Sequence, residues 1–181
     1  MERRIELEEL KELLTARKYT NIRQFLVELN EADIAFLMEE LEDEERLKVY
    51  RILPKDLAAD VFSYLEFDSQ EAIITSLSDR EAGSVIDNLM ADDATDLLEE
   101  MPANIVKKLL ASARADTRRD INHLLRYPEY SAGSIMTVEY VDLKENMTVE
   151  DAIQRIRKVG VDSETINICY VLDSKRTLVG T

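Results

Sequence analysis

A twelve-residue repeat of apolar residues is the feature that most limits how this chain can fold. The first column of the repeat holds leucine or methionine at Leu29, Leu41, Leu53, Leu65, Leu77, Leu89 and Met101. Four residues before each of these stands a second apolar column, formed by Phe25, Leu37, Val49, Val61, Ile73, Val85 and Leu97. The residues that follow the second column are also apolar. Apolar residues at i, i+1 and i+4 share one face of an α-helix, so each unit predicts a short amphipathic helix.

Such helices are too short to be stable alone and must bury their apolar faces on neighbouring units. The repeat therefore predicts a mostly α-helical fold, a superhelical bundle of short repeated helices of the α-solenoid kind. Pro54 and Pro102 directly follow the first column, where a helix should stop. Segments 4–16 and 21–30 predict two further helices, and residues 104–126 predict one longer helix. The helix N-caps are predicted at Asp56, Asp68, Asp92 and Asn104.

The charge of the chain is strongly negative and unevenly distributed. The net charge is −15 at pH 7, which repels phosphate backbones and excludes nucleic acid as a partner. Residues 28–101 carry 22 acidic and 5 basic residues, whereas residues 102–126 carry 6 basic and 2 acidic residues. The acidic and basic parts could attract each other, contact different partners, or simply form solvated faces, and these alternatives remain open.

After Tyr127 the composition of the chain changes. Pro128 and Gly133 interrupt the helical pattern, and VEYVDL then predicts a short strand. NMTVEDAIQRIRKV predicts a helix with Thr148 as its N-cap and Asp151 as the capping-box acid. INICYVLD predicts a buried strand, and TLVGT begins another strand. We therefore expect an acidic helical-repeat domain over residues 1–126, followed over residues 127–181 by a linker and a β-α-β-β segment.

The second part, with SIMTVEYVDLKENMTVEDAIQRIR and CYVLDSKRTLVGT, resembles the opening of a cystathionine-β-synthase (CBS) module, an α/β unit. Such a module continues into one more helix, so we expect a truncated CBS domain with an incomplete apolar face. The order of acidic helical repeats, the YPEYSAGSIMT junction and the CBS start resembles the MgtE magnesium-transporter family over nearly the whole chain.

The resemblance implies a regulatory, Mg²⁺-sensing region on the cytoplasmic side of the cell membrane. It implies that Mg²⁺ bound between the N domain and CBS domains favours a closed pore. The implied partners are the second CBS module and the transmembrane pore of the same chain, and a homodimer in the full-length protein. CBS pairs in the family can bind ATP. Here Ile168 stands where an aromatic adenine contact is expected, so we expect no nucleotide binding by this chain.

The stretch MADDATDLLEEM holds five carboxylates in twelve residues. Asp92 and Asp96 are four residues apart, so both lie on one side of a helix with their Cβ atoms about 6 Å apart. Such a pair can hold a hydrated Mg²⁺ ion, because Mg²⁺ takes one or two carboxylates and keeps several waters. The family resemblance places Asp60, Asp92 and Asp96 at acidic Mg²⁺-bridging positions. The alternative is that these residues cap and solvate the helices, and both roles can coexist at one carboxylate.

The sequence offers no catalytic site. One histidine and one cysteine cannot form a zinc site of the usual kind, and no nucleophilic triad or phosphate-binding loop is recognisable. We therefore expect a regulatory protein and no enzyme. The competing hypothesis is a helical-repeat scaffold for protein interactions, which resembles flagellar switch proteins in its short helices and senses no specific metal.

Overall fold

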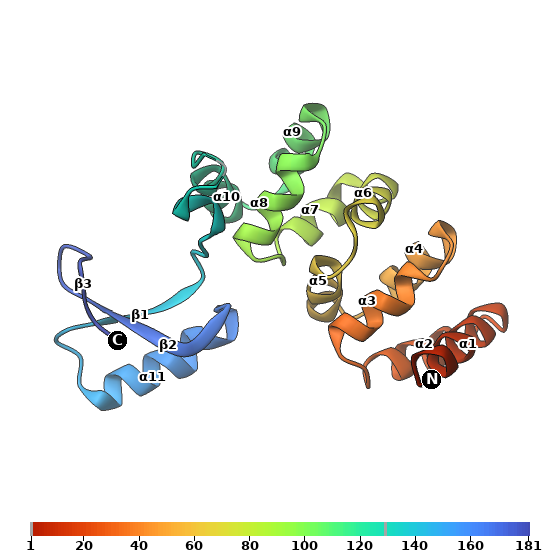
Figure 1. The fold of residues 1–181 in the computed structure, drawn as a ribbon, viewed down its shortest axis with the longest axis horizontal. Helices are drawn as coiled ribbons and strands as arrows, with labels where there is room; N and C mark the ends of the chain where they lie inside the picture. The colour runs from red at the N-terminus through yellow and green to blue at the C-terminus, as the bar shows by residue number, and fades with distance from the viewer. Residues whose placement is uncertain (1, 129) are drawn as a thin grey trace. The chain divides into compact units, whose positions relative to one another are not determined.

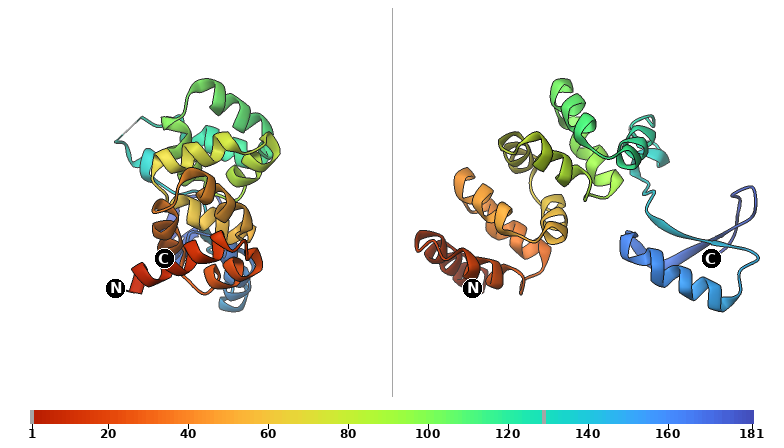
Figure 2. Two further views of the ribbon diagram at one scale, coloured as in Figure 1. Left: turned by 90° about the vertical axis from the view of Figure 1, so that its right-hand side faces the viewer. Right: turned by 180° about the vertical axis from the view of Figure 1, so that it is seen from behind.

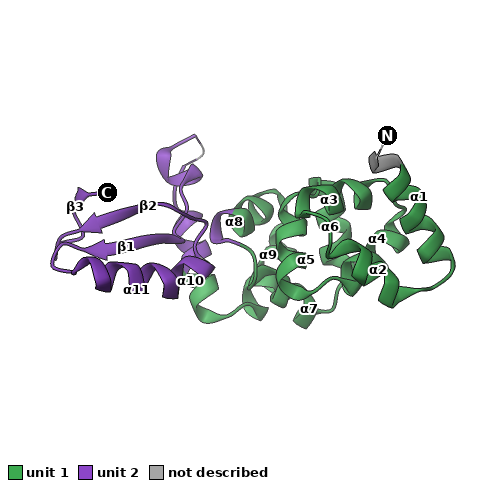
Figure 3. Cartoon of the chain, turned by 90° about the horizontal axis from the view of Figure 1, so that it is seen from below, with its two compact units in different colours: residues 1–89, 93–119 green, residues 90–92, 120–181 purple. Residues whose placement is uncertain are grey.

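The computed structural model describes residues 2–128 and 130–181 of the chain. These residues form a run of short helices followed by a small mixed sheet (Figure 1). The chain divides into two compact units, the first of residues 1–89 and 93–119 and the second of residues 90–92 and 120–181 (Figure 3). The predicted domain boundary after residue 126 stays a prediction.

The helical repeat is confirmed, and its spacing is regular. The first two helices are α1 (Glu2–Thr15) and α2 (Tyr19–Leu26). From α3 onward each helix begins twelve residues after the preceding one: α3 (Glu31–Glu39), α4 (Asp43–Ile52), α5 (Lys55–Ser63), α6 (Phe67–Ser76), α7 (Asp79–Ile86), α8 (Ala91–Glu100), α9 (Ala103–Ser112) and α10 (Ala115–Leu124). No described helix is both long and apolar enough to cross a membrane.

The apolar columns of the repeat form the core of the first unit. Leu37, Val49 and Val61 are fully buried, as are Met38 and Phe62 that follow the second column. Several helices pack on the helix that comes two places later in the chain. The pairs in contact are α1 with α3, α2 with α4, α3 with α5, α4 with α6, and α7 with α9. The successive helices of this unit are visible in Figure 2. Burial of their apolar faces on neighbouring helices stabilises helices that are too short to form alone.

The predicted N-caps were wrong by two residues. Asp56, Asp68, Asp92 and Asn104 are each the second residue of their helix, in α5, α6, α8 and α9. The caps of α5, α6 and α9 are Pro54, Glu66 and Pro102, whose ψ angles of 145°, 148° and 137° are not helical. In the first turn a carboxylate still stabilises the helix, because it faces the positive end of the helix dipole.

The single long helix predicted over residues 104–126 was also wrong, since the repeat continues through two helices. The break falls at Ala113, which is extended with φ −75° and ψ 155°. The backbone N–H of Arg114 donates to Asp87 Oδ1 at 2.8 Å, and Arg114 Nη2 donates to the Asp87 carbonyl at 2.9 Å. Contacts with the residue that follows α7 therefore hold the chain at this break.

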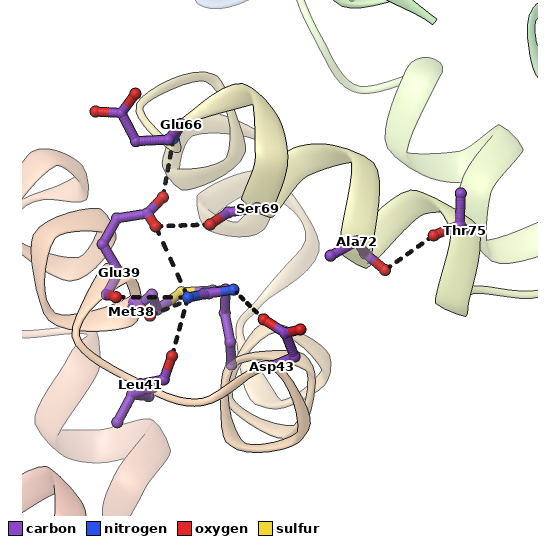
Figure 4. A network of polar contacts seen from close by, with 9 residues as sticks. Met38, Glu39, Leu41, Asp43, Glu66, Ser69, Ala72 and Thr75 are labelled. Atoms are coloured by element: carbon purple, nitrogen blue, oxygen red, sulfur yellow. Dashed lines mark hydrogen bonds and ion pairs between the residues drawn. The ribbon is translucent and has the colours of Figure 1, made fainter. Parts of the chain in front are cut away.

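Arg46 of α4 links three helices through a buried network (Figure 4). Its Nε donates to the Met38 carbonyl at 3.0 Å, and its Nη2 donates to the Leu41 carbonyl at 2.9 Å. Its guanidinium also lies 3.8 Å from the Glu39 carboxylate. Glu39 in turn accepts the backbone N–H of Glu66 at 2.9 Å and the Ser69 hydroxyl at 2.6 Å, at the start of α6. The network thus satisfies the last carbonyls of α3 and the first donors of α6.

The second unit contains the predicted β-α-β-β order. A short 3-10 helix, η1 (Ala132–Ile135), precedes β1 (Tyr140–Lys144), α11 (Val149–Val159), η2 (Gly160–Asp162), β2 (Thr165–Leu172) and β3 (Leu178–Gly180). The sheet order is β1-β2-β3, with β1 and β2 parallel and β2 and β3 antiparallel. The capping box predicted for Thr148 and Asp151 is present at the start of α11.

The prediction that INICYVLD forms a buried strand was wrong. β2 forms there, but the Ile166 and Ile168 residues are each 52% exposed and Cys169 is only half-buried. A strand is buried on both faces only when a layer covers each face. Within the described residues, α11 packs on the sheet chiefly through contacts with β1. The expected incomplete apolar face is therefore observed.

Candidate metal-binding site

Two of the predicted metal ligands, Asp92 and Asp96, lie on α8. Asp92 is its second residue and is half-buried, whereas Asp96 lies one turn later and is exposed. Ala94, Leu97 and Leu98 are buried and anchor the opposite side of this helix. The helical conformation therefore places Asp92 and Asp96 on one side of α8, as the spacing predicted.

Glu139 brings a further carboxylate to the start of α8. Its Oε1 accepts the backbone N–H of Ala91 at 3.0 Å, although the two residues are 48 positions apart. Its backbone N–H donates to Thr137 Oγ1 at 3.1 Å, and Thr137 Oγ1 also donates to Glu139 Oε2 at 3.4 Å. The sequence alone does not indicate Glu139 as a site residue, because no local pattern links residue 139 to the first turn of α8.

The environment of Glu139 is unfavourable to its negative charge. Burial raises the pKa of Glu139 above its ordinary value, and the nearby Asp92 carboxylate raises this pKa further. The hydrogen bonds from Ala91 and Thr137 act in the opposite direction. Two carboxylates in such proximity are stabilised by a proton or by a cation.

Asp96 lies beside a small acidic cavity in the first unit. The cavity measures about 140 Å³, and its acidic lining consists of Asp93, Asp96 and Glu100. Phe62 and Phe67 contribute apolar walls. Burial raises the pKa of the Asp96 carboxyl. The Asp96 carboxylate is therefore also incompletely solvated, which disfavours its negative charge.

Asp60 lies on α5 and is exposed. Burial raises the pKa of the Asp60 carboxyl, and the negative charges of Glu31 and Asp56 raise it further. Glu31 is the first residue of α3, so packing of α3 on α5 adds a third acidic residue near Asp56 and Asp60. A cation near Asp60 would relieve this repulsion.

The predicted ligands do not form one complete site in the structure. Asp92 and Asp96 share α8, whereas Asp60 lies on α5. Over residues 2–128 and 130–181, no group of three or more histidine, cysteine, aspartate or glutamate residues has the arrangement of a metal site. Mg²⁺ tolerates such a sparse site, because it retains waters where protein ligands are few.

Comparison with known proteins identifies relatives of the chain. Residues 29–130 match the family model of the MgtE intracellular N domain. The chain is 35% identical over 176 residues to the magnesium transporter MgtE of Thermus thermophilus, covering 94% of the chain and 39% of the relative. It is 30% identical over 168 residues to the magnesium transporter MgtE of Bacillus subtilis, covering 93% of the chain and 37% of the relative. The chain thus spans less than two fifths of the length of either relative.

Two solved structures resemble nearly the whole chain. The soluble part of a magnesium transporter superposes with a TM-score of 0.90 at 26% identity, over 98% of this chain and 70% of that one. The cytosolic domain of the Mg²⁺ channel MgtE in complex with ATP gives a TM-score of 0.85 at 34% identity, over 95% of this chain and 71% of that one. These similarities confirm the fold class of a helical bundle followed by a partial CBS module.

Proposed function

The chain belongs to the MgtE magnesium-transporter family, and from this premise we propose that it is a Mg²⁺-sensing regulatory region on the cytosolic side of a magnesium transporter or channel. Asp60, Asp92 and Asp96 contribute carboxylates to sites where Mg²⁺ binds between the N domain and CBS surfaces of the full-length protein. Further ligands come from parts of that protein beyond these residues. Bound Mg²⁺ favours the closed pore, and the full-length protein acts as a homodimer.

The observation that best supports this proposal is the pairing of Glu139 with the start of α8. Glu139 accepts the N–H of Ala91, and its pKa responds to the charge of Asp92. Folding therefore gathers carboxylates that the sequence keeps far apart, at a cost in electrostatic repulsion that a divalent cation would offset. The raised pKa values of Asp60 and Asp96 support the same interpretation.

The proposed regulation follows from a difference in affinity. An ion shifts a conformational equilibrium only by binding one state more tightly than the other. When Mg²⁺ is abundant, it neutralises acidic surfaces and stabilises the state in which they approach each other. When Mg²⁺ is scarce, repulsion between these surfaces favours their separation.

The first test is thermal unfolding of this chain as a function of Mg²⁺ concentration, with NaCl matched for ionic strength and Ca²⁺ as a second divalent ion. We expect a saturable rise in Tm with Mg²⁺, as for any ligand that binds the folded state. The Asp92→Asn plus Asp96→Asn variant should lose this rise. The matched control, Glu40→Gln plus Glu99→Gln, removes two exposed charges and should retain it.

The gating proposal is tested in the full-length transporter. Changing Asp60, Asp92 and Asp96 together to alanine should abolish the Mg²⁺ dependence of pore closure. Normal Mg²⁺-dependent gating in that variant would refute the assignment of these residues. If this chain also responded to Mg²⁺ no differently from NaCl, the protein-interaction scaffold would become the better hypothesis.

A further inference from the structure

A cavity among α4, α5 and α7 differs in charge from the acidic unit around it. Its volume is about 390 Å³, which is within the usual range for small-molecule sites. Its apolar lining includes Leu53, Ala58, Ala59, Leu77 and Val85, all of them buried side chains. The cavity lies entirely within the first unit.

Most of the basic residues of the acidic region, residues 28–101, line this cavity. Residues 28–101 contain five basic residues. Two of them have other roles, since Arg46 belongs to the buried network and Lys48 pairs with Glu44 at 3.7 Å. The other three, Arg51, Lys55 and Arg80, all line this cavity.

These three cations are only weakly neutralised by the protein. Arg51 lies 3.6 Å from Glu81, the one acidic residue of the cavity lining, and donates to the Ser76 carbonyl at 3.4 Å. The Glu81 carboxylate already accepts the N–H and the hydroxyl of Ser78, at 2.9 and 2.7 Å. Lys55 and Arg80 have no ion-pair partner within the described part of the chain.

The remaining lining supplies neutral polar groups next to the cations. Ser84 lies in α7 and Asn88 just after its end, and Asn88 Nδ2 donates to the Ser84 carbonyl at 2.5 Å. Tyr50 contributes an aromatic ring that is almost fully buried against Phe62. An apolar pocket with a few convergent polar and charged groups is typical of a small-molecule site.

From this arrangement we propose that the cavity binds a small organic anion, with an oxyanion head group among Arg51, Lys55 and Arg80 and an apolar body against the floor formed by Ala58, Ala59 and Val85. Arginine binds carboxylates and phosphates through paired hydrogen bonds, so both head groups suit this rim. The acidic surroundings repel a bare anion. The apolar body is therefore required, because its burial supplies attraction that a free ion lacks.

The test uses calorimetric titration of this 181-residue chain at low ionic strength, where charge is least screened. The probes are octanoate and octyl phosphate, with octanol as the uncharged analogue and inorganic phosphate as the head group alone. At least one of the two amphiphilic anions should bind more tightly than octanol and than inorganic phosphate. The tighter of the two identifies the preferred head group.

Two exposed cations provide a variant that should keep the fold. Lys55→Gln plus Arg80→Gln should weaken binding by roughly ten-fold or more. Lys48→Gln plus Lys107→Gln removes the same charge outside the cavity and should change the affinity little. Amide chemical shifts should change chiefly in α4, α5 and α7 on titration with the tighter probe.

Three results would overturn the proposal. The first is octanol binding as tightly as the anions, because the cations would then play no part. The second is equal weakening by the two pairs of substitutions, which would indicate a general charge effect. The third is a set of shift changes located outside α4, α5 and α7.

Discussion

Replacing Arg46 with methionine tests whether the buried guanidinium holds three helices together. Arg46 donates to the carbonyls of Met38 and Leu41 and pairs with Glu39. Methionine fills a similar volume but donates no hydrogen bond. The substitution therefore removes donors from buried carbonyls and the partner charge from a partly buried carboxylate.

The expected loss of stability is about 3 kcal/mol, the lower end of the range for breaking a buried charged pair. Separate hydrogen bonds to charged groups contribute about 1.5–3 kcal/mol each, but in a network these values are not additive. The bond from Arg46 to Asp43, at 2.7 Å, contributes little because Asp43 is exposed. For a chain of this length, such a loss lowers Tm by roughly 6–12 °C.

The assay is urea unfolding followed by far-ultraviolet circular dichroism, with Lys48→Met as the matched control. Lys48 lies in the same helix and its pair with Glu44 is exposed, so its replacement should cost about 0.5 kcal/mol or less. If Arg46→Met were no more destabilising than Lys48→Met, the network would not stabilise the fold and the reasoning would be wrong.

Three further predictions concern single positions elsewhere in the chain. Glu139 has a raised pKa, so its contribution to stability is present below the ordinary value of 4.5 and is lost as pH rises through the folded-state value. The unfolding free energy of the wild type minus that of Glu139→Gln should therefore fall from pH 4 to pH 7. A difference independent of pH would contradict this. Thr148→Ala removes the cap of α11 and should cost about 1 kcal/mol, measured as faster hydrogen exchange of the α11 amides, whereas unchanged exchange would show that the cap is dispensable. Gly83→Ala would place a Cβ 2.9 Å from Ser112 Cβ and should destabilise by about 1–2 kcal/mol in urea unfolding. The added Cβ would also lie 2.9 Å from the Ser112 backbone carbonyl oxygen, which cannot rotate away, so a variant as stable as the wild type would contradict this prediction.

The positions of the repeated helices could be predicted from the sequence because a helix period is a local property. Apolar residues at i, i+1 and i+4 must share a face wherever a helix forms, and the twelve-residue spacing indicated where each unit would recur. The capping box at Thr148 and Asp151 was predicted for the same reason, since its partners are three residues apart. Family membership also followed from linear order, through the acidic repeats, the SAGSIMT junction and the CBS start.

The helix boundaries were less predictable. Aspartate at the start of a repeat suits both an N-cap and the second position of a helix, and local preference alone does not separate these choices. The break at Ala113 was missed for a different reason. It is held by Asp87, which the repeat brings near only after α7 and α9 have packed.

The acidic stretch of α8 and the spacing of Asp92 and Asp96 were thus determined by the sequence itself. Only the tertiary structure decided that Glu139 reaches the N–H of Ala91, that Glu31 adds its charge near Asp60, and that Arg51, Lys55 and Arg80 line one cavity. The physical reason is the distance along the chain over which each kind of interaction acts. Periodicity and capping depend on neighbours within one or two helical turns, whereas electrostatic clusters depend on which residues packing brings together across the fold.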